Sequence, residues 1–170
     1  MGLRPARCYK KTERPFTRQS RRKPKKGYVK GVPSPKIKKF EVGDPKKSFD
    51  TTLYLVSNET AQIRHNALES VRVTLHKRLE KDVGKEAYFA KILIYPHHVL
   101  RENLLATGAG ADRFQTGMRK AYGKNVSSAA QVKAGQKLVE VRVAKAKEGK
   151  ARTILKAVSS KFSAKCVIAA

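Results

Sequence analysis

Two adjacent histidines, His97 and His98, come closest to a catalytic pair in this sequence. Histidine titrates near neutral pH, so two imidazoles that flank a substrate atom could serve as general acid and general base in a nuclease. Neighbouring side chains on extended backbone point to opposite sides, however, and the spacing favours neither Glu102 nor Asp112 as an orienting carboxylate. We therefore expect no enzymatic activity from these residues.

A metal site and a nucleotide cofactor are also unsupported by the spacing of ligand-forming residues. Cys8 and Cys166 lie at opposite ends of the chain, and neither C-x2-C nor H-x3–5-H spacing occurs, so we predict no metal site and two free thiols. The run Gly108-Ala109-Gly110 lacks the GxGxxG and GxxxxGK[ST] patterns of phosphate-binding turns. We expect its glycines to allow close approach of another backbone, or loop movement, and we predict no cofactor.

The chemistry that the chain does offer is phosphate binding. Its first 47 residues contain seventeen Lys or Arg, three acids and six of the seven prolines. Prolines this frequent prevent a helix, and so little apolar surface cannot offset the entropy of ordering. We expect residues 1–48 to form an extended arm that becomes ordered against RNA or DNA, with spaced aromatic residues available to stack on bases.

The residues that we expect to contact nucleic acid come mainly from this arm. The predicted phosphate-binding cations are Arg4, Arg7, Lys10, Lys11, Arg14, Arg18, Arg21, Arg22, Lys23, Lys25, Lys26, Lys30, Lys36 and Lys38. Tyr9, Phe16 and Tyr28 are candidates for stacking on bases, and the alternative role of anchoring the arm on the protein's own surface stays open. Outside the arm, the basic face of a predicted helix contributes Arg64, His65 and Arg72.

The remainder of the chain is basic as well. The formal charge is +26, and subtracting the arm (17 − 3 = +14) leaves 22 − 10 = +12 on residues 48–170. A polyanion is the natural counter-charge for such a domain, because it repels itself when free. We expect a location in the cytosol or nucleus, because no apolar run approaches the roughly 20 residues of a membrane span and no signal segment follows Met1.

RNA is favoured over DNA because no helix-turn-helix, zinc finger or basic zipper is present. Two alternatives remain open: an architectural DNA-binding protein and a ribonuclease that uses His97 and His98.

Periodicity and turn residues predict one α+β domain over residues 49–170. We expect strands at 36–42, 49–57, 88–95, 136–144 and 165–169, and helices at 57–82 and 146–162. Ser57 or Asn58 should cap the first helix, and Gly84 should end it. Residues 97–123, which contain four glycines, should form a long loop. The predicted architecture is a mainly antiparallel sheet with two helices packed on one face, a sandwich.

Several stretches resemble one family. RPARCYKKTERPFTRQS (4–20), YVKGVPSPKIKKFEVG (28–43), QIRHNALES (62–70), IYPHHVLRENLLATGAGADR (94–113), GMRKAYGK (117–124) and VKAGQKL (132–138) closely resemble the large-subunit ribosomal protein called ten-e in archaea and sixteen in bacteria. The end of the chain soon after its last predicted strand looks archaeal in type. Ala121, Ser127 and Ser128 depart from the family pattern, in which we expect proline at 121 and small apolar residues at the other two positions.

The resemblance implies a non-enzymatic, cytoplasmic component of the large ribosomal subunit. It implies docking on large-subunit rRNA close to 5S rRNA, contacts with neighbouring ribosomal proteins, and no membrane association or homo-oligomer. It also implies that a loop at 101–114 helps to position tRNA in the aminoacyl and peptidyl sites near the peptidyl-transferase centre, with no covalent step carried by the protein. The residues that would frame this loop are His97, His98, Arg101, Gly108, Gly110, Arg113 and Arg119, with Lys120 and Lys124 as further RNA contacts.

Overall fold

The computed structural model describes residues 3–12, 29–103, 108–110, 113 and 123–170. Its larger sheet has five strands in the order β1-β4-β7-β2-β8, and every neighbouring pair is antiparallel. The strands are β1 (Glu41–Gly43), β2 (Thr51–Ser57), β4 (Tyr88–Ile92), β7 (Lys137–Val143) and β8 (Cys166–Ala169). The central strands β2 and β7 are rich in β-branched and aliphatic residues, which fit a sheet covered on one face.

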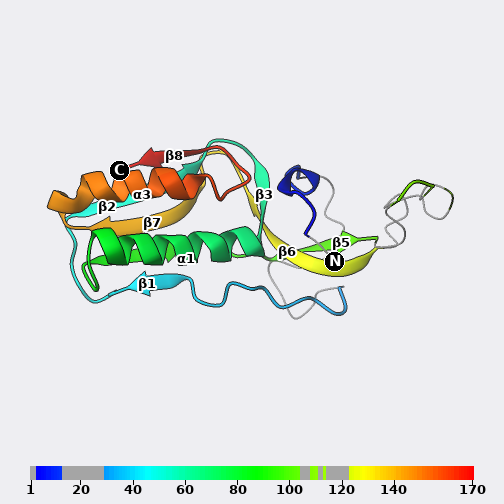
Figure 1. The fold of residues 1–170 in the computed structure, drawn as a ribbon, viewed down its shortest axis with the longest axis horizontal. Coiled ribbons are helices and arrows are strands. Elements are labelled where there is room, and N and C mark those ends of the chain that lie inside the picture. Colours follow the sequence, from blue (N-terminus) through cyan, green and yellow to red (C-terminus); the bar gives the residue numbers. More distant parts are fainter. Residues whose placement is uncertain (1–2, 13–28, 104–107, 111–112, 114–122) are drawn as a thin grey trace.

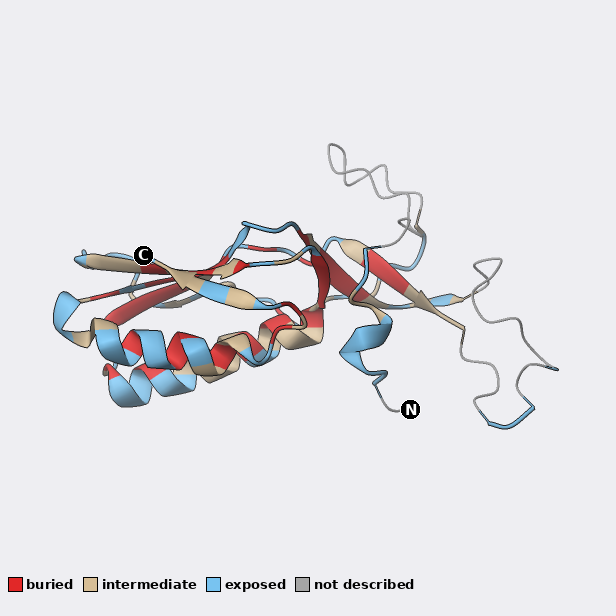
Figure 2. Ribbon diagram, turned by 90° about the horizontal axis from the view of Figure 1, so that it is seen from above, coloured by how far each residue is buried: buried red, intermediate tan, exposed pale blue. Residues whose placement is uncertain are grey.

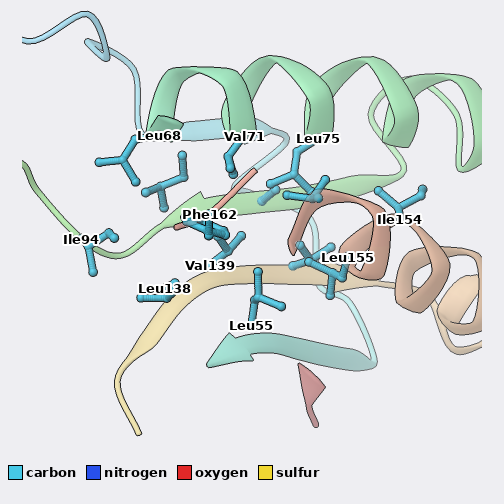
Figure 3. Close-up of a cluster of buried hydrophobic side chains, with 14 of the residues drawn as sticks. Leu55, Leu68, Val71, Leu75, Ile94, Leu138, Val139, Ile154, Leu155 and Phe162 are labelled. Atoms are coloured by element: carbon cyan, nitrogen blue, oxygen red, sulfur yellow. The ribbon is translucent and has the colours of Figure 1, made fainter. Parts of the chain in front are cut away.

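Two helices, α1 (His65–Asp82) and α3 (Glu148–Ser159), lie side by side on one face of this sheet (Figures 1 and 2). Each helix buries residues at spacings of three and four, which places them on one stripe. The buried residues are Leu68, Val71, Leu75 and Leu79 of α1, and Ala151, Ile154, Leu155 and Val158 of α3. Phe162, Leu55, Leu138 and Val139 complete the core between the layers (Figure 3).

Two lysines at the start of α3 contact backbone carbonyls at the C-terminal end of α1. The described residues include two short 3-10 turns, η1 (Ala6–Cys8) and η3 (Lys145–Lys147), and the second leads into α3. Lys147 Nζ donates to the carbonyl of Val83 at 2.5 Å, just past the end of α1, and Lys150 Nζ lies 3.5 Å from the carbonyl of Asp82. Cations at this position complement the partial negative charge of a helix C-terminus.

A second, three-stranded sheet extends beyond the N-terminal end of α1 (Figure 1). Its strands are β3 (Ala61–Arg64), β6 (Lys124–Val132) and β5 (His98–Glu102), in the antiparallel order β3-β6-β5. Strand β3 leads directly into α1, because Arg64 has extended backbone angles and His65 is the first helical residue. We call these three strands the small sheet. Among the described residues, no helix is long and apolar enough to cross a membrane.

The predicted α+β class with two helices and antiparallel sheets is confirmed, and so is the end of the first helix at Asp82; the second helix ends at Ser159, three residues before the predicted end at 162. The N-terminal arm and the Gly-rich loop lie partly outside the described residues. The predicted start of the first helix, at residue 57 or 58, was wrong. Ser57 is buried in β2 and donates its hydroxyl to the carbonyl of Glu59, and residues 61–64 form β3, so the helix begins only at His65.

Strands β5 and β6 also differ from the prediction. The sequence predicts a loop over residues 97–123, whereas residues 98–102 form β5; residues 124–132, for which no element is predicted, form β6. The sequence KNVSSAAQV of β6 has few strand-forming residues. Its strand conformation comes from pairing on both sides, with β3 and β5. The division between an arm and a domain at residue 48 stays a prediction.

Gly43 gives a direct test of how β1 joins the sheet. Its φ is +93°, and a Cβ added there would overlap the carbonyl oxygen of Tyr88, so we expect Gly43→Ala to lower the free energy of unfolding by about 3 kcal/mol or more. Gly84 is the matched control, because its φ is +105° but no atom lies within 4 Å of an added Cβ. Gly84→Ala should cost only the conformational strain, about 1–2 kcal/mol. Equal shifts in urea unfolding would contradict the predicted overlap.

Candidate nucleic-acid interface

The N-terminal segment, residues 3–12, docks on the small sheet through Gln62. The backbone N–H of Gln62 donates to the carbonyl of Lys10 at 2.9 Å. Its side-chain Nε2 donates to the carbonyls of Tyr9 and Lys11, at 3.1 and 2.9 Å. Because one buried glutamine holds three consecutive carbonyls, this part of the predicted arm has a defined path over β3.

Tyr9 anchors this segment through both its ring and its hydroxyl. The hydroxyl donates to Oε2 of Glu102 at 3.1 Å, and Arg4 forms an ion pair with the same carboxylate. The guanidinium of Arg64 lies 5.3 Å from the centre of the Tyr9 ring. Burial, followed by the hydrogen bond to Glu102, raises the pKa of Tyr9 to about 12. Of the two roles left open for Tyr9, these contacts match the anchoring role.

A second part of the predicted arm, at residues 30 and 31, also contacts the small sheet, near the start of β6. Asn125 Nδ2, in β6, donates to the carbonyl of Lys30 at 2.7 Å and lies 3.4 Å from that of Gly31. Asn125 pairs with Arg101 across the β5–β6 ladder, one position from Glu102. The described segments before and after residues 13–28 are therefore both held on the small sheet. Glu102, the last residue of β5, holds the first segment, and Asn125, near the start of β6, holds the second.

Residues 36–38 alternate between the surface and the core. Ile37 is 1% exposed, while Lys36 and Lys38 are exposed on either side of it. The backbone N–H of Lys36 donates to Nδ1 of His65 at 2.9 Å. His65 is 6% exposed, and burial, together with the nearby Lys36 and Arg64, lowers its pKa. We had expected His65 on an RNA-facing helix surface; the structure instead places it as a buried anchor for the segment that leads to β1.

The outer face of α1 carries the predicted basic surface in part. Arg72 donates to both carboxylate oxygens of Glu69, at 2.6 and 2.9 Å, so its charge is largely matched within the helix. Lys77, Arg78 and Lys81 are exposed. Lys150, Arg152, Lys156 and Lys161, in or just after α3, add exposed cations that we had not included. The signal in the sequence that could have identified them is the recurrence of basic residues along that helix.

The two histidines occupy different environments. The ring of His97 lies 4.4 Å from that of Tyr95, and Tyr95 stacks on Phe40 at 5.4 Å, which makes a partly exposed row of three rings. His98 begins β5 and pairs with Ala129. Because the two adjacent side chains have different neighbours, their arrangement agrees with the argument against a catalytic pair. In the described part of the chain, no group of three His, Cys, Asp or Glu side chains could hold a metal ion, and both cysteines are free.

Several predicted contact residues remain to be placed. Arg7, Lys11 and Lys124 are exposed, as are Gly108, Gly110 and Arg113, and the N–H of Arg113 donates to the carbonyl of Gly110 at 3.1 Å. The predicted residues that lie outside the described ranges are Arg14, Phe16, Arg18, Arg21, Arg22, Lys23, Lys25, Lys26, Tyr28, Arg119 and Lys120.

A basic α+β domain with a docked cationic segment defines a class of nucleic-acid-binding protein. Residues 16–169 match the family described as ribosomal protein L16p/L10e. The chain is 46% identical over 168 residues to the large ribosomal subunit protein uL16 of Hyperthermus butylicus, with 95% of the chain and 89% of the relative covered. The uL16 of Staphylothermus marinus is 48% identical over 163 residues, with 95% and 90% covered. For the uL16 of Methanococcus maripaludis the identity is 43% over 169 residues, with 99% and 94% covered.

The chain therefore belongs to the ribosomal protein L16p/L10e family, a family of structural ribosomal proteins and not of enzymes. The resemblance drawn from the sequence motifs is confirmed, including its archaeal type, since these relatives are archaeal.

Tyr9 offers a spectroscopic test of the docked segment. Its raised pKa means that the folded state favours the neutral phenol, so docking contributes stability below the ordinary pKa of about 10 and loses it as the pH rises to about 12. In an alkaline titration of phenolate absorbance, the difference between the wild type and Tyr9→Phe should have its midpoint near pH 12, and Glu102→Gln should lower it. A midpoint near pH 10, with the circular dichroism unchanged, would show that Tyr9 is not docked.

Proposed function

We propose that this protein is a structural constituent of the large ribosomal subunit that binds large-subunit rRNA and carries out no covalent step. Family membership across residues 16–169 is the observation that carries the proposal. The charge of +26 supports it independently, because a chain with 39 basic and 13 acidic residues needs an external polyanion. As part of that subunit it would contact neighbouring ribosomal proteins in the cytoplasm, and it would act as a single copy.

The rRNA contacts would come from exposed cations around the small sheet. Those in the described part of the chain are Arg7, Lys11, Lys30, Lys36, Lys38 and Lys124. Gln62, Asn125 and His65 hold the backbone of the segments that carry Lys11, Lys30 and Lys36, and Lys124 belongs to β6, so this backbone is already ordered before RNA binds. Such preorganisation lowers the entropy that each phosphate contact must overcome. The exposed rings of Tyr95 and His97 offer further surfaces on which a base could stack.

The finer part of the proposal concerns tRNA. We propose that the protein lies close to 5S rRNA and that residues 101–114 help to position tRNA near the peptidyl-transferase centre. The support is the resemblance of residues 94–113 to the family, together with the position of Arg101 and Glu102 at the end of a paired strand. A loop that begins and ends on one antiparallel pair has a fixed base from which to reach a second ligand.

Salt dependence tests the phosphate contacts. Affinity for a large-subunit rRNA fragment should fall with a log–log slope of about 0.7–0.9 per contact, reaching about 10 or more. The double variant K36Q/K38Q should reduce this slope by about 1.5, because two contacts are lost. The control K46Q/K47Q removes equal charge at exposed positions between β1 and β2, at the far end of the molecule from the small sheet, and should change the slope less (Figure 1). A shallow wild-type slope would contradict phosphate binding, and preference for duplex DNA would favour the architectural alternative.

Deletion of residues 103–112 tests the tRNA role. Eleven residues would still connect Glu102 to Lys124, which are paired across β5 and β6, so the hairpin can close without strain. We expect affinity for the rRNA fragment to stay within about twofold, while chemical footprints of tRNA on reconstituted subunits weaken. Loss of rRNA binding would instead identify this loop as an anchor, and unchanged footprints would remove the tRNA role.

A further inference from the structure

Strand β8 forms one outer edge of the five-stranded sheet (Figure 1). It pairs with β2 on one side, and the N–H of Asn58, just past β2, donates to the carbonyl of Lys165 at 2.8 Å. Backbone groups in an antiparallel ladder alternate between the two sides of a strand, so Val167 also bonds toward β2, whereas the N–H and C=O groups of Cys166 and Ile168 point away from it. Within the described ranges, no backbone group bonds to them, so they form an open hydrogen-bonding edge.

The other three sheet edges in the described part of the chain are each protected. The edge of β3 is covered by the docked segment of residues 3–12, where the N–H of Gln62 donates to the carbonyl of Lys10. Strand β1 has only three residues and carries the charged Glu41, and strand β5 carries Arg101 and Glu102. Short length, charge and a covering segment are the usual means by which proteins keep sheet edges from pairing with another chain.

Strand β8 has four residues, but it has neither charge nor cover. Residues 166–170 contain no charged side chain, no proline and no glycine, in a chain in which 31% of the residues are charged. Val167 is 56% exposed and lies directly opposite Val56, on the face of the sheet that the helices leave uncovered. Lys165 precedes the strand, and its N–H donates to the carboxylate of Glu59 at 2.7 Å. The edge therefore offers apolar surface and peptide groups.

The cations on the uncovered face of the same sheet are matched within the protein. Arg142 pairs with Glu140 at 2.5 Å, and Lys91 pairs with Glu41 at 2.6 Å. Nζ of Lys137 lies 3.5 Å from the centre of an aromatic ring. A phosphate would find little unmatched positive charge here, in contrast to the exposed cations around the small sheet, so this region fits a protein partner better than RNA.

We propose that β8 takes an extended segment of a neighbouring ribosomal protein as a sixth strand, hydrogen-bonded to Cys166 and Ile168 and with an apolar side chain against Val167. The inference rests on the proposed function, under which the chain lies beside other proteins of the large subunit, and it names the surface that one of them uses. A strand supplies both donors and acceptors at the spacing of the edge. A phosphate only accepts, so it would leave the two outward carbonyls unpaired. The segment that covers β3 docks on this fold in the same way.

The test is a photo-cross-linker at position 167 of the full-length chain in reconstituted large subunits. Cys166 allows a synthetic peptide for residues 166–170, with p-benzoylphenylalanine in place of Val167, to be joined to the recombinant remainder by native chemical ligation. We expect irradiation to give one ribonuclease-resistant cross-link, to a segment of another ribosomal protein. The same cross-linker at Lys36, a proposed rRNA contact, should give a ribonuclease-sensitive product.

A methyl group on the backbone nitrogen of Ile168 tests the strand pairing itself. It removes an outward N–H and keeps the side chain, so the unfolding temperature of the isolated protein should change by less than about 2 °C. The yield of the cross-link at position 167 should fall at least threefold, because the added strand loses a hydrogen bond and meets the methyl group. The matched control is a methyl group on the nitrogen of Ala169, which faces β2 and should lower the unfolding temperature.

Each opposing outcome overturns the docking site. A ribonuclease-sensitive product at position 167 would make β8 an RNA contact, and a cross-link to a second copy of this chain would make it a site of self-association. An unchanged yield after methylation of Ile168 would mean contact without strand pairing, and a lowered unfolding temperature would mean that its N–H serves within the fold. If Lys36 cross-links to rRNA while position 167 gives no product, the docking site fails and the proposed function stands.

Discussion

The antiparallel pairing of β5 with β6 is the interaction on which the candidate interface depends. It brings Glu102 opposite Lys124, with Asn125 one position further along the ladder. Glu102 then binds Arg4 and Tyr9 at one end of the predicted arm, and Asn125 holds the carbonyl of Lys30 at the other. If this pairing were lost, the base of the loop and the contacts of Glu102 with Arg4 and Tyr9 would be lost with it, although Gln62 of β3 would still hold the carbonyls of residues 9–11 and the helix-covered sheet would keep its own core.

The distribution of carboxylates explains why so much positive charge stays available. Of the 13 acidic residues, seven form ion pairs with Lys or Arg within the described part of the chain: Glu41, Glu59, Glu69, Glu86, Glu102, Glu140 and Glu148. Exposed pairs add little stability. Because 39 basic residues face only 13 acidic ones, most lysines and arginines cannot be matched by a carboxylate of the same chain. An external polyanion is the physical consequence of that excess.

Local patterns in the sequence predicted the elements whose packing is amphipathic, and failed where pairing over long distances decides. The stripe of α3 is buried as expected, and Gly84 has the positive φ of a helix stop. Strand β3 reads as the start of a helix because Ser57 and Asn58 are good caps, yet its pairing with residues 129–132 of β6 prevails. Strict alternation would place Leu138 and Val139 on opposite faces of β7, but both are in the core, where the register of β7 with β2 shifts between Leu55 and Val56 (Figure 3).

The same limit applies to the site, where residue types were informative and roles were not. The sequence suggested Tyr9 as a stacking residue with an alternative anchoring role, but the partners that decide between them, Arg64 and Glu102, lie 55 and 93 positions away. In the structure, stacking of a base on Tyr9 would have to displace Arg64 from its ring, since the ring already has a cation over it. Tyr95 and His97 are exposed, and in the described part of the chain their rings contact each other and Phe40 rather than a cation. Near Tyr9, the proposed RNA contact is therefore Arg64 itself, whose guanidinium lies over the tyrosine ring.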